Sequence, residues 1–308
     1  MRFDRLDLNL LVALDVLIAE RNVSAAAKRL NLSQPALTGA LNRLREFFKD
    51  DILVQAGRGM VPTPRAEELA APVREALMLI RSKITTPSEF DPATAVRDFV
   101  IVASDFAFNV LLATALADAS QKAPNITFEI LSTDRLAVER MERGEADLVL
   151  TIGDYLSKDH PRKPLFQDEH AVICCSDGPY RAGIDTKGFF EAGHAIAYFG
   201  SEKHPAFTET YFAQKQRDRR VELRVPNFAA LPQSVVGSNR VATMYRRHAE
   251  HFARLLPITV LDMPFEMPII SEEVQWNAMR GDDKGLQWLL GLLFAHSDRL
   301  PPVRTAGR

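Results

Sequence analysis

The chain has 308 residues and a net charge of −2, with 46% hydrophobic and 25% charged residues. This length favours about two domains, and the composition is typical of a globular protein with a sizeable core. Early charges at Arg2, Asp4 and Arg5 argue against a secretory signal peptide, and no apolar run approaches the roughly 18 residues of a membrane span. We therefore expect a cytoplasmic location and no membrane partner.

The N-terminal region carries a local excess of positive charge. Residues 21–49 contain six basic residues and one acidic residue: Arg21, Lys28, Arg29, Arg43, Arg45 and Lys49 against Glu46. Such an excess suits a surface that faces DNA phosphates. Charge alone is equally compatible with a solvated helix face, so the assignment depends on how the helices are built.

Two helices are predicted before residue 33. The first is amphipathic, because apolar residues recur every three or four positions at Leu8, Leu11, Leu14, Leu17 and Ile18. A short second helix has Ser24 as its expected N-cap. It ends at Asn31 and Leu32, since Asn tolerates the left-handed conformation that often follows a helix.

A third helix begins immediately after this break. Ser33 is the expected N-cap, and Pro35 falls in the first turn, where a missing N–H costs nothing. One face carries Leu37, Leu41, Leu44 and Phe48, which we expect to pack on the first two helices. The outer side carries short polar, small and basic residues: Gln34, Ala36, Thr38, Gly39, Asn42, Arg43 and Arg45.

This outer side suits insertion into a DNA major groove. Gln makes bidentate contacts to adenine, Ser and Thr reach bases or phosphates, and a helix N-terminus favours phosphate. A plain helical hairpin with a polar exterior is the alternative. The DNA-binding residues predicted from this pattern and from the following wing are Ser24, Ser33, Gln34, Pro35, Ala36, Thr38, Arg43, Arg45 and Arg58.

The segment DDILVQAGRGMVPTP predicts a two-stranded wing, with Arg58 between two glycines at its tip. A long helix then starts near Thr63 and Pro64. Its apolar residues Leu69, Val73, Ala76, Ile80 and Ile84 are spaced like a coiled-coil seam, so we expect pairing with a second subunit. Pro72 departs from the pattern and should bend or weaken this helix.

After a polar linker at residues 87–98, strand-like and helical segments alternate, which predicts a parallel α/β fold. FVIVAS, ITFEIL, ADLVLT, HAVICCS, GHAIAYF, VELRVP and RVATM read as strands, and residues 106–120 and 136–143 as helices. The adjacent cysteines Cys174 and Cys175 lie in such a strand, and we expect both to be reduced core residues.

The order of helix-turn-helix, wing, long helix and larger C-terminal domain resembles the LysR-type transcriptional regulators. The segments DLNLL, GRGMVPTP, FDP and VQW resemble two groups within that family, the nodulation regulators that answer plant flavonoids and the regulators of aromatic-compound breakdown. Two residues depart from the family pattern: many members have an arginine in place of Gln55 and a small residue in place of Arg65.

The resemblance implies a winged helix-turn-helix at 1–63, a linker and dimerisation helix at 64–86, and an effector-binding domain at 87–308. That domain is expected to be α/β and two-lobed, like type 2 periplasmic binding proteins. Lobe I would comprise about 95–165 and 270–308 and lobe II about 166–269, with the second crossing near 264–270. The partners implied are double-stranded promoter DNA, a small and aromatic effector, and further copies of the chain as a homodimer and homotetramer. RNA polymerase would join them if the protein is an activator.

Candidate effector-binding residues come from position and from the resemblance. Ser104, Asp105 and Thr151 lie at strand ends, at the edge where such sheets bind ligands, although Ser104 is equally suited to be a simple N-cap. The family pattern adds His170, His204 and Arg247, with Arg247 as an anchor for a carboxylate or phenolate. Phe106, Phe228 and Trp276 are candidates for an aromatic wall.

The sequence contains no nucleophile elbow, phosphate loop or dinucleotide fingerprint. His248 and His251 share a helix face, but nothing completes a metal site, so we expect no metal and no cofactor. We therefore predict a ligand-responsive transcriptional regulator. A regulator that answers a non-aromatic molecule, an enzyme fused to a DNA-binding domain and a transported solute receptor are the alternatives.

Overall fold

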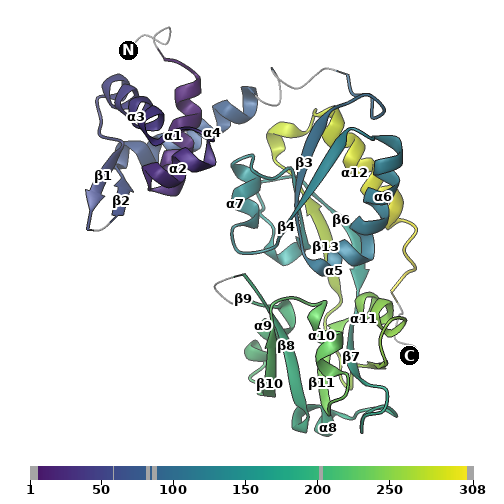
Figure 1. Cartoon of the computed structure of the whole chain (residues 1–308). Helices are drawn as coiled ribbons and strands as arrows, with labels where there is room; N and C mark the ends of the chain where they lie inside the picture. Colours follow the sequence, from purple (N-terminus) through teal and green to yellow (C-terminus); the bar gives the residue numbers. More distant parts are fainter. Residues whose placement is uncertain (1–5, 58, 81–83, 85–88, 201–203, 304–308) are drawn as a thin grey trace. The chain divides into compact units, whose positions relative to one another are not determined.

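In the computed structural model the chain forms two units, Met1–Pro87 and Ser88–Arg308 (Figure 1). The structure describes residues 6–57, 59–80, 84, 89–200 and 204–303. The predicted wing-tip residue Arg58 and part of the predicted helix beyond Ile80 lie outside these residues.

The N-terminal unit contains three helices, a two-stranded wing and a fourth helix. These are α1 (Asn9–Glu20), α2 (Val23–Arg29), α3 (Gln34–Phe48), β1 (Leu53–Ala56), β2 (Gly59–Pro62) and α4 (Pro64–Leu79). β1 and β2 pair antiparallel, as the sequence predicted. The predicted break between the second and third helices is also present, with Asn31 in the left-handed region at φ 53°.

Leucines from α1 and α3 form the centre of this unit. Leu14, Leu17, Leu37 and Leu44 are fully buried in one cluster. Burial of each such side chain stabilises the fold by about 1.5–3 kcal/mol. These contacts fix which side of α3 is inside, so its polar side is left outward.

The predicted N-cap of the second helix was wrong by two residues. Helix α2 begins at Val23, and Asn22 is its cap, accepting a hydrogen bond from the Ala25 N–H at 3.0 Å. Asn22 has the extended backbone of an N-cap residue, whereas Ser24 already lies inside the helix. The Ser24 hydroxyl is therefore available to another element.

Helix α4 packs on α1 through Ala66, Ala70, Val73 and Leu77. Val73, which the sequence placed in a seam between subunits, is only 5% exposed and belongs to the core of its own unit. The sequence could not show whether Val73 packs inside its unit or between subunits. Val73 belongs both to the predicted seam, which contains Leu69 and Ala76, and to the buried series, which contains Ala70 and Leu77. Pro72 is exposed inside a continuous helix, so it does not end α4.

The C-terminal unit has two lobes, each built on its own sheet. Lobe I contains β3 (Arg97–Ala103), α5 (Asp105–Ala107), η3 (Phe108–Leu112), α6 (Ala113–Lys122), β4 (Ile126–Ser132), α7 (Ala137–Glu142), β5 (Leu148–Ile152), η4 (Gly153–Tyr155), β6 (Arg162–Asp168), β13 (Ile270–Gln275), η5 (Ala278–Arg280) and α12 (Lys284–Ser297). Its strand order is β4-β3-β5-β13-β6, with β13 antiparallel to both neighbours.

Lobe II contains the segment between β6 and β13. Its elements are β7 (His170–Cys175), α8 (Thr186–Glu191), β8 (Gly193–Phe199), β9 (His204–Pro205), α9 (Phe207–Gln214), β10 (Arg220–Val225), α10 (Ala230–Val235), β11 (Arg240–Tyr245), α11 (Arg246–Ala253) and β12 (Ile258–Asp262). The strand order is β10-β8-β11-β7-β12, and β9 pairs with β8. The chain passes between the sheets at 168–170 and again at 262–270, where the sequence suggested boundaries near 166 and 270.

Alternation along the strands distributes side chains to two layers of lobe I. Ile101 and Leu150 face the large cluster on the side of α6 and α12, whereas Val102 and Val149 face the cluster on the side of α7 (Figure 1). A strand buried on both faces reads as a continuous apolar run, which is why β3 and β5 were recognisable in the sequence.

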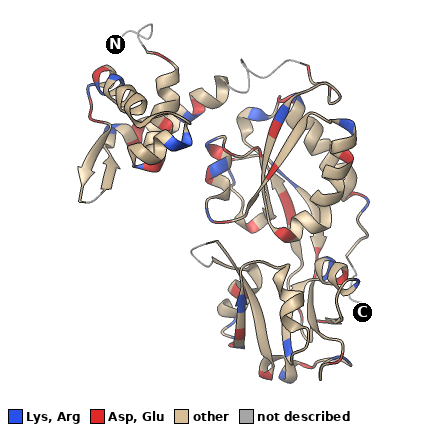
Figure 2. Cartoon of the chain, viewed as in Figure 1, with Lys and Arg blue, Asp and Glu red and all other residues tan. Residues whose placement is uncertain are grey.

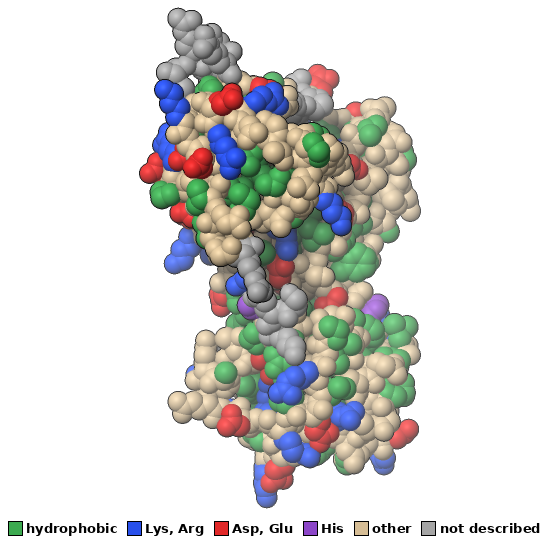
Figure 3. Space-filling view, turned by 60° about the vertical axis from the view of Figure 1, so that its left-hand side comes forward, with side chains coloured by type: hydrophobic (Ala, Val, Ile, Leu, Met, Phe, Trp, Pro, Cys, Tyr) green, Lys and Arg blue, Asp and Glu red, His purple; other side chains and the backbone are tan. Residues whose placement is uncertain are grey.

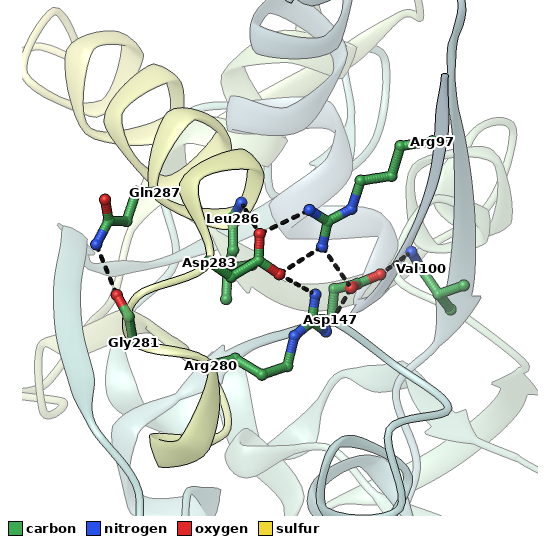
Figure 4. A network of polar contacts seen from close by, with 8 residues as sticks. All are labelled: Arg97, Val100, Asp147, Arg280, Gly281, Asp283, Leu286 and Gln287. Carbon is green, nitrogen blue, oxygen red and sulfur yellow. Dashed lines mark hydrogen bonds and ion pairs between the residues drawn. The ribbon is translucent and has the colours of Figure 1, made fainter. Parts of the chain in front are cut away.

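A buried ionic network joins the last helix to the first strand of lobe I (Figure 4). Asp283, the N-cap of α12, accepts two hydrogen bonds from Arg97, at 2.6 and 2.7 Å, and one from Arg280 at 2.7 Å. Arg280 also pairs with Asp147 at 2.5 Å. Burial alone would raise the pKa of Asp283, but the hydrogen bonds from the two arginines outweigh it and hold the pKa well below its usual value.

Candidate nucleic-acid interface and ligand cavity

The N-terminal part of α3 presents a polar surface to solvent. Ser33, Gln34, Pro35, Ala36 and Thr38 are all exposed, while the leucines of the same helix face the core. Ser33 caps the helix as predicted, its hydroxyl accepting from the Ala36 N–H at 3.3 Å. In the face of the N-terminal unit seen in Figure 3, hydrophobic side chains lie beside Lys and Arg side chains.

Two hydroxyl groups hold Gln34 in place. Ser24 of α2 donates to the Gln34 side-chain oxygen at 3.1 Å, and Thr38 donates to the Gln34 backbone carbonyl at 2.9 Å. The Gln34 side chain is thereby oriented before any partner arrives. A pre-oriented side chain loses less conformational entropy on binding.

The two arginines of α3 have different surroundings. Arg43 is exposed and makes a solvated ion pair with Asp7 at 3.4 Å, so its guanidinium is accessible to a phosphate. Arg45 is half-buried and donates to the backbone carbonyls of Asp51 and Leu53 at 2.9 and 3.2 Å. The prediction that Arg45 contacts DNA is therefore corrected: Arg45 fixes the segment that leads into the wing.

The C-terminal unit contains a cavity of about 370 Å³ lined by residues of both lobes. This volume is within the range of small-molecule sites, about 300–1,000 Å³. Lobe I contributes Ser104, Phe106, Thr133, Asp134, Arg135, Ala137, Val138, Thr151, Ile152, Tyr155 and Glu272. Lobe II contributes Phe199, His204, Pro205, Ala206, Phe207, Thr210, Phe228 and Tyr245.

Aromatic rings form one wall of this cavity. The ring of Tyr245 lies 4.5 Å from that of Phe106 and 5.3 Å from that of Phe228, and Phe228 in turn contacts Phe199 at 4.9 Å. Tilted and edge-on rings at these distances are the favoured arrangement of aromatic pairs. The wall is suited to contact the ring of a flat apolar ligand.

Five of the nine predicted effector residues line the cavity: Ser104, Phe106, Thr151, His204 and Phe228. Ser104 directly follows β3 and Thr151 is the penultimate residue of β5, so the strand-end rule led to two residues that line the cavity. Ser104 is also the N-cap of α5, with its hydroxyl accepting from the Ala107 N–H at 3.1 Å. Ser104 therefore caps α5 and also lines the cavity.

Asp105 and His170 were wrongly placed at the ligand surface. Asp105 accepts the Ala229 N–H at 2.5 Å and so ties lobe I to lobe II; burial raises its pKa. His170 is buried behind the cavity wall, with its ring near those of Phe207 and Tyr245, and burial lowers its pKa to about 4. In both cases the side chain points to a neighbouring element that the sequence does not reveal.

Arg247 and Trp276 also lie away from the cavity. Arg247 donates to the backbone carbonyls of Gln167 and Pro301, so it holds the C-terminal segment instead of a ligand anion. Trp276 directly follows β13 and packs against the large hydrophobic cluster. The predicted anionic anchor is therefore absent from the cavity wall.

Sequence reasoning missed Thr133, Asp134, Tyr155, Tyr245 and Glu272. Thr133 and Asp134 follow β4 at the same sheet edge as Ser104, so the rule that found Ser104 would have found them too. Glu272 lies within β13, in a segment that reads as a half-exposed strand. Nothing local distinguishes it from Glu273 beside it.

The charged groups of the cavity differ in their partners. Asp134 makes a bidentate ion pair with Arg140, at 2.8 Å for both contacts. Glu272 is only 1% exposed, and its Oε1 has no hydrogen-bond partner among the described residues. Burial, together with the smaller effect of the charge of Asp168, raises the pKa of Glu272 to about 8.

The described residues contain no cluster of three or more His, Cys, Asp or Glu side chains that is arranged to hold a metal ion. No helix in the described part of the chain is long and apolar enough to span a bilayer. Acidic and basic residues are interspersed along the elements of the C-terminal unit (Figure 2). Cys174 and Cys175 are buried and unbridged, as the sequence suggested.

Comparison with known families gives a match to each unit. Residues 8–67 match the family described as "Bacterial regulatory helix-turn-helix protein, lysR family". Residues 94–298 match the "LysR substrate binding domain". Together these matches cover most of the chain.

Two relatives are similar over nearly the whole length. Nodulation protein D 2 of Bradyrhizobium diazoefficiens is 37% identical over 301 residues, covering 97% of this chain and 91% of that protein. Nodulation protein D 1 of Rhizobium meliloti is 36% identical over 303 residues, covering 98% of each.

Solved structures show the same fold. The probable transcriptional regulator PA0477 from Pseudomonas aeruginosa has a TM-score of 0.63 at 27% identity, covering 95% of this chain and 98% of that one. Full-length CbnR in complex with its target DNA has a TM-score of 0.51 at 14% identity, covering 95% of this chain and 100% of that one.

Proposed function

Because the chain belongs to the LysR family of transcriptional regulators, we propose that it controls transcription from promoter DNA in response to a small aromatic effector bound between the two lobes. The family assignment makes the protein a DNA-binding regulator and not an enzyme. The same proposal places it in the cytoplasm, together with the promoter.

Helix α3 is the proposed reading element. Gln34 at its exposed N-terminal end is held by Ser24 and Thr38, and a Gln amide is suited to a bidentate contact with adenine in the major groove. Ser33 and the first turn of the helix would face a phosphate, and Arg43 a second one. Pro35 and Ala36 are small enough to let the backbone approach the DNA closely.

The observation that carries the effector proposal is the cavity between the lobes, with an aromatic wall from Phe106, Phe228 and Tyr245. Polar groups at Ser104 and Thr151 provide hydrogen bonds to the ligand edge. The resemblance to nodulation regulators suggests a flavonoid, a flat molecule of linked rings that carries hydroxyl groups. A non-aromatic effector is the alternative, but no feature of the cavity favours it.

Ligand binding acts on DNA binding only if it favours one arrangement of the lobes, because equal affinity for two states shifts neither. The described contacts between lobes include the Asp105–Ala229 hydrogen bond and a 3.0 Å contact between Asn109 and His248. Both join the helical segment after β3 to lobe II. A ligand beside this segment is therefore placed to change how firmly the lobes are held.

Self-association belongs to the same proposal. Leu79 on α4 is 52% exposed and Ile84 is 73% exposed, and large apolar side chains of a helix are commonly covered by a partner. We propose a homodimer formed through this end of the linker helix, and a homotetramer made of two dimers. An activator would in addition contact RNA polymerase.

The test combines DNA selection with ligand titration. The operator is first selected from a random DNA library with the full-length protein, and thermal shift and calorimetry then follow hydroxylated flavones, phenols and benzoates. We expect a ligand that binds the native state to raise the unfolding temperature and to change operator affinity. If none of these compounds binds, the aromatic assignment is wrong.

The Arg247→Ala variant provides a matched check on the location of the site. Because Arg247 bonds backbone carbonyls away from the cavity, its removal should leave the ligand dissociation constant within about twofold of wild type. A loss of ligand affinity of more than tenfold would show that Arg247 binds the polar end of the ligand.

A further inference from the structure

Glu272 is a buried carboxyl group whose surroundings do not explain its presence. In the sheet it lies opposite Ile152 of β5 and Phe166 of β6, and both of these neighbours are apolar. Its Oε1 is buried and has no hydrogen-bond partner among the described residues, while the side chain forms part of the cavity wall. Buried polar atoms are normally hydrogen-bonded, so an unpaired oxygen on a residue that lines a cavity points to a ligand.

The charged groups nearest to Glu272 favour its neutral form. Asp168 on β6 is also buried and acts on Glu272 as a like charge. Tyr245 on β11 and Tyr155 on η4 are uncharged, and burial keeps His170 on β7 neutral. Arg247 directs its backbone N–H to Asp168, at 3.2 Å, and its guanidinium to backbone carbonyls. A protonated carboxyl offers one O–H donor and one carbonyl acceptor.

We propose that Glu272 selects the effector: its neutral carboxyl group exchanges hydrogen bonds with a hydroxyl group of an uncharged aromatic ligand and disfavours aromatic carboxylates. The inference rests on the proposed effector site. A phenolic hydroxyl is both donor and acceptor, so it satisfies this carboxyl without adding charge. A ligand carboxylate at the same place would bring a third acidic group beside Glu272 and Asp168, and like charges this close resist ionisation together.

The proposed ligand class follows from the aromatic wall and from Glu272. The aromatic wall contacts the ring, and Glu272 on the neighbouring sheet meets a polar substituent of that ring. Sites built to hydrogen-bond a hydroxyl group reject analogues that lack it, because the buried group of the protein is then left unpaired. We therefore expect discrimination between molecules that differ in a single hydroxyl group.

The experiment uses three probes with one ring system: a hydroxyflavone, the parent flavone and a flavone carboxylate. Calorimetry with the wild-type full-length protein should give the tightest binding for the hydroxyflavone and the weakest for the carboxylate. Glu272→Leu should weaken hydroxyflavone binding about tenfold and leave parent flavone nearly unchanged. Glu272→Gln, which keeps a neutral donor and acceptor, should remain within about threefold of wild type.

A second readout separates a ligand-binding role from a structural one. If Glu272 has no partner in the free protein, Glu272→Leu should raise the unfolding temperature of the ligand-free protein while it reduces the shift that hydroxyflavone produces. The matched control is Glu273→Gln on the same strand, whose carboxylate instead pairs with Arg162 at 3.6 Å. This control should keep the wild-type order of the three probes.

The possible failures are distinguishable. Binding of none of the three probes would overturn the aromatic effector and this inference with it. Equal binding of flavone and hydroxyflavone, stronger binding of the carboxylate, or a lower unfolding temperature for Glu272→Leu would overturn the role of Glu272 alone. In the last three cases the proposed regulator would stand.

Discussion

The surface of α3 and the cavity of the C-terminal unit are built in opposite ways. The described residues of the first site lie between Ser24 and Arg43, within one helix-turn-helix. The cavity gathers residues from Ser104 to Glu272, which come from both sheets and several connections. A site made from one short segment depends on local rules, whereas a site made from distant segments depends on everything that positions those segments.

The largest expected effect tests how much the ionic network around Asp283 stabilises the unit that contains the cavity. Asp283→Ala would remove the carboxylate that accepts hydrogen bonds from both Arg97 and Arg280 and, among the described residues, leave them only their ion pairs with Asp147, which should cost the C-terminal unit about 3 kcal/mol in free energy of unfolding. Denaturant unfolding monitored separately for the two units should show this loss in the C-terminal unit alone. Lys284→Ala, at the exposed neighbouring position, is the control.

Helix α4 packs in the core of its own unit and is also the helix through which we propose self-association. Val73→Asp should destabilise the N-terminal unit by about 3 kcal/mol or more, because it removes a buried apolar side chain and introduces a charge into the core. Leu79→Asp should leave that stability nearly unchanged and weaken self-association. Sedimentation velocity measures the self-association, and urea unfolding measures the free energy of unfolding. A folded but monomeric Val73→Asp protein would show that Val73 lies in the interface between subunits.

A specific pH effect is expected from Glu272 in the cavity. The pKa of Glu272 is raised to about 8 in the folded protein, above its unfolded value, so the folded state holds a proton that the unfolded state has lost. Relative to Glu272→Gln, wild-type stability should therefore be highest below about pH 4.5 and fall by about 1.4 kcal/mol per pH unit until the pH passes about 8. Parallel stability curves for the two proteins would show that the carboxyl has an ordinary pKa.

The smallest expected effect concerns the local site. Gln34→Ala should cost about 1–3 kcal/mol at one base pair of the operator and relax the preference there. Arg43→Ala should weaken binding to all sequences alike and reduce the salt dependence by about one phosphate contact. Fluorescence anisotropy on the selected operator and on single-base variants separates the two; unchanged sequence preference in Gln34→Ala would remove α3 from the reading role.

Within the N-terminal unit, local sequence determined most of the structure. Ser33, Pro35 and the leucine spacing of α3 predicted its start and its buried side, because capping and amphipathic packing act within a few residues. The exceptions arose where two local patterns competed: Asn22 replaced Ser24 as a cap, and Val73 satisfied both an internal and an external apolar series.

In the C-terminal unit, local signals in the sequence predicted the strands and placed Ser104 and Thr151 at the sheet edge that borders the cavity. The direction of the other polar side chains was decided by the tertiary structure alone. Arg247 and Asp105 meet backbone groups that are 54 and 124 residues away along the chain, and their hydrogen bonds turn them from the cavity. Glu272 is buried because β5 and β6 enclose it from both sides, and burial in that apolar setting, not its residue type, makes its carboxyl neutral.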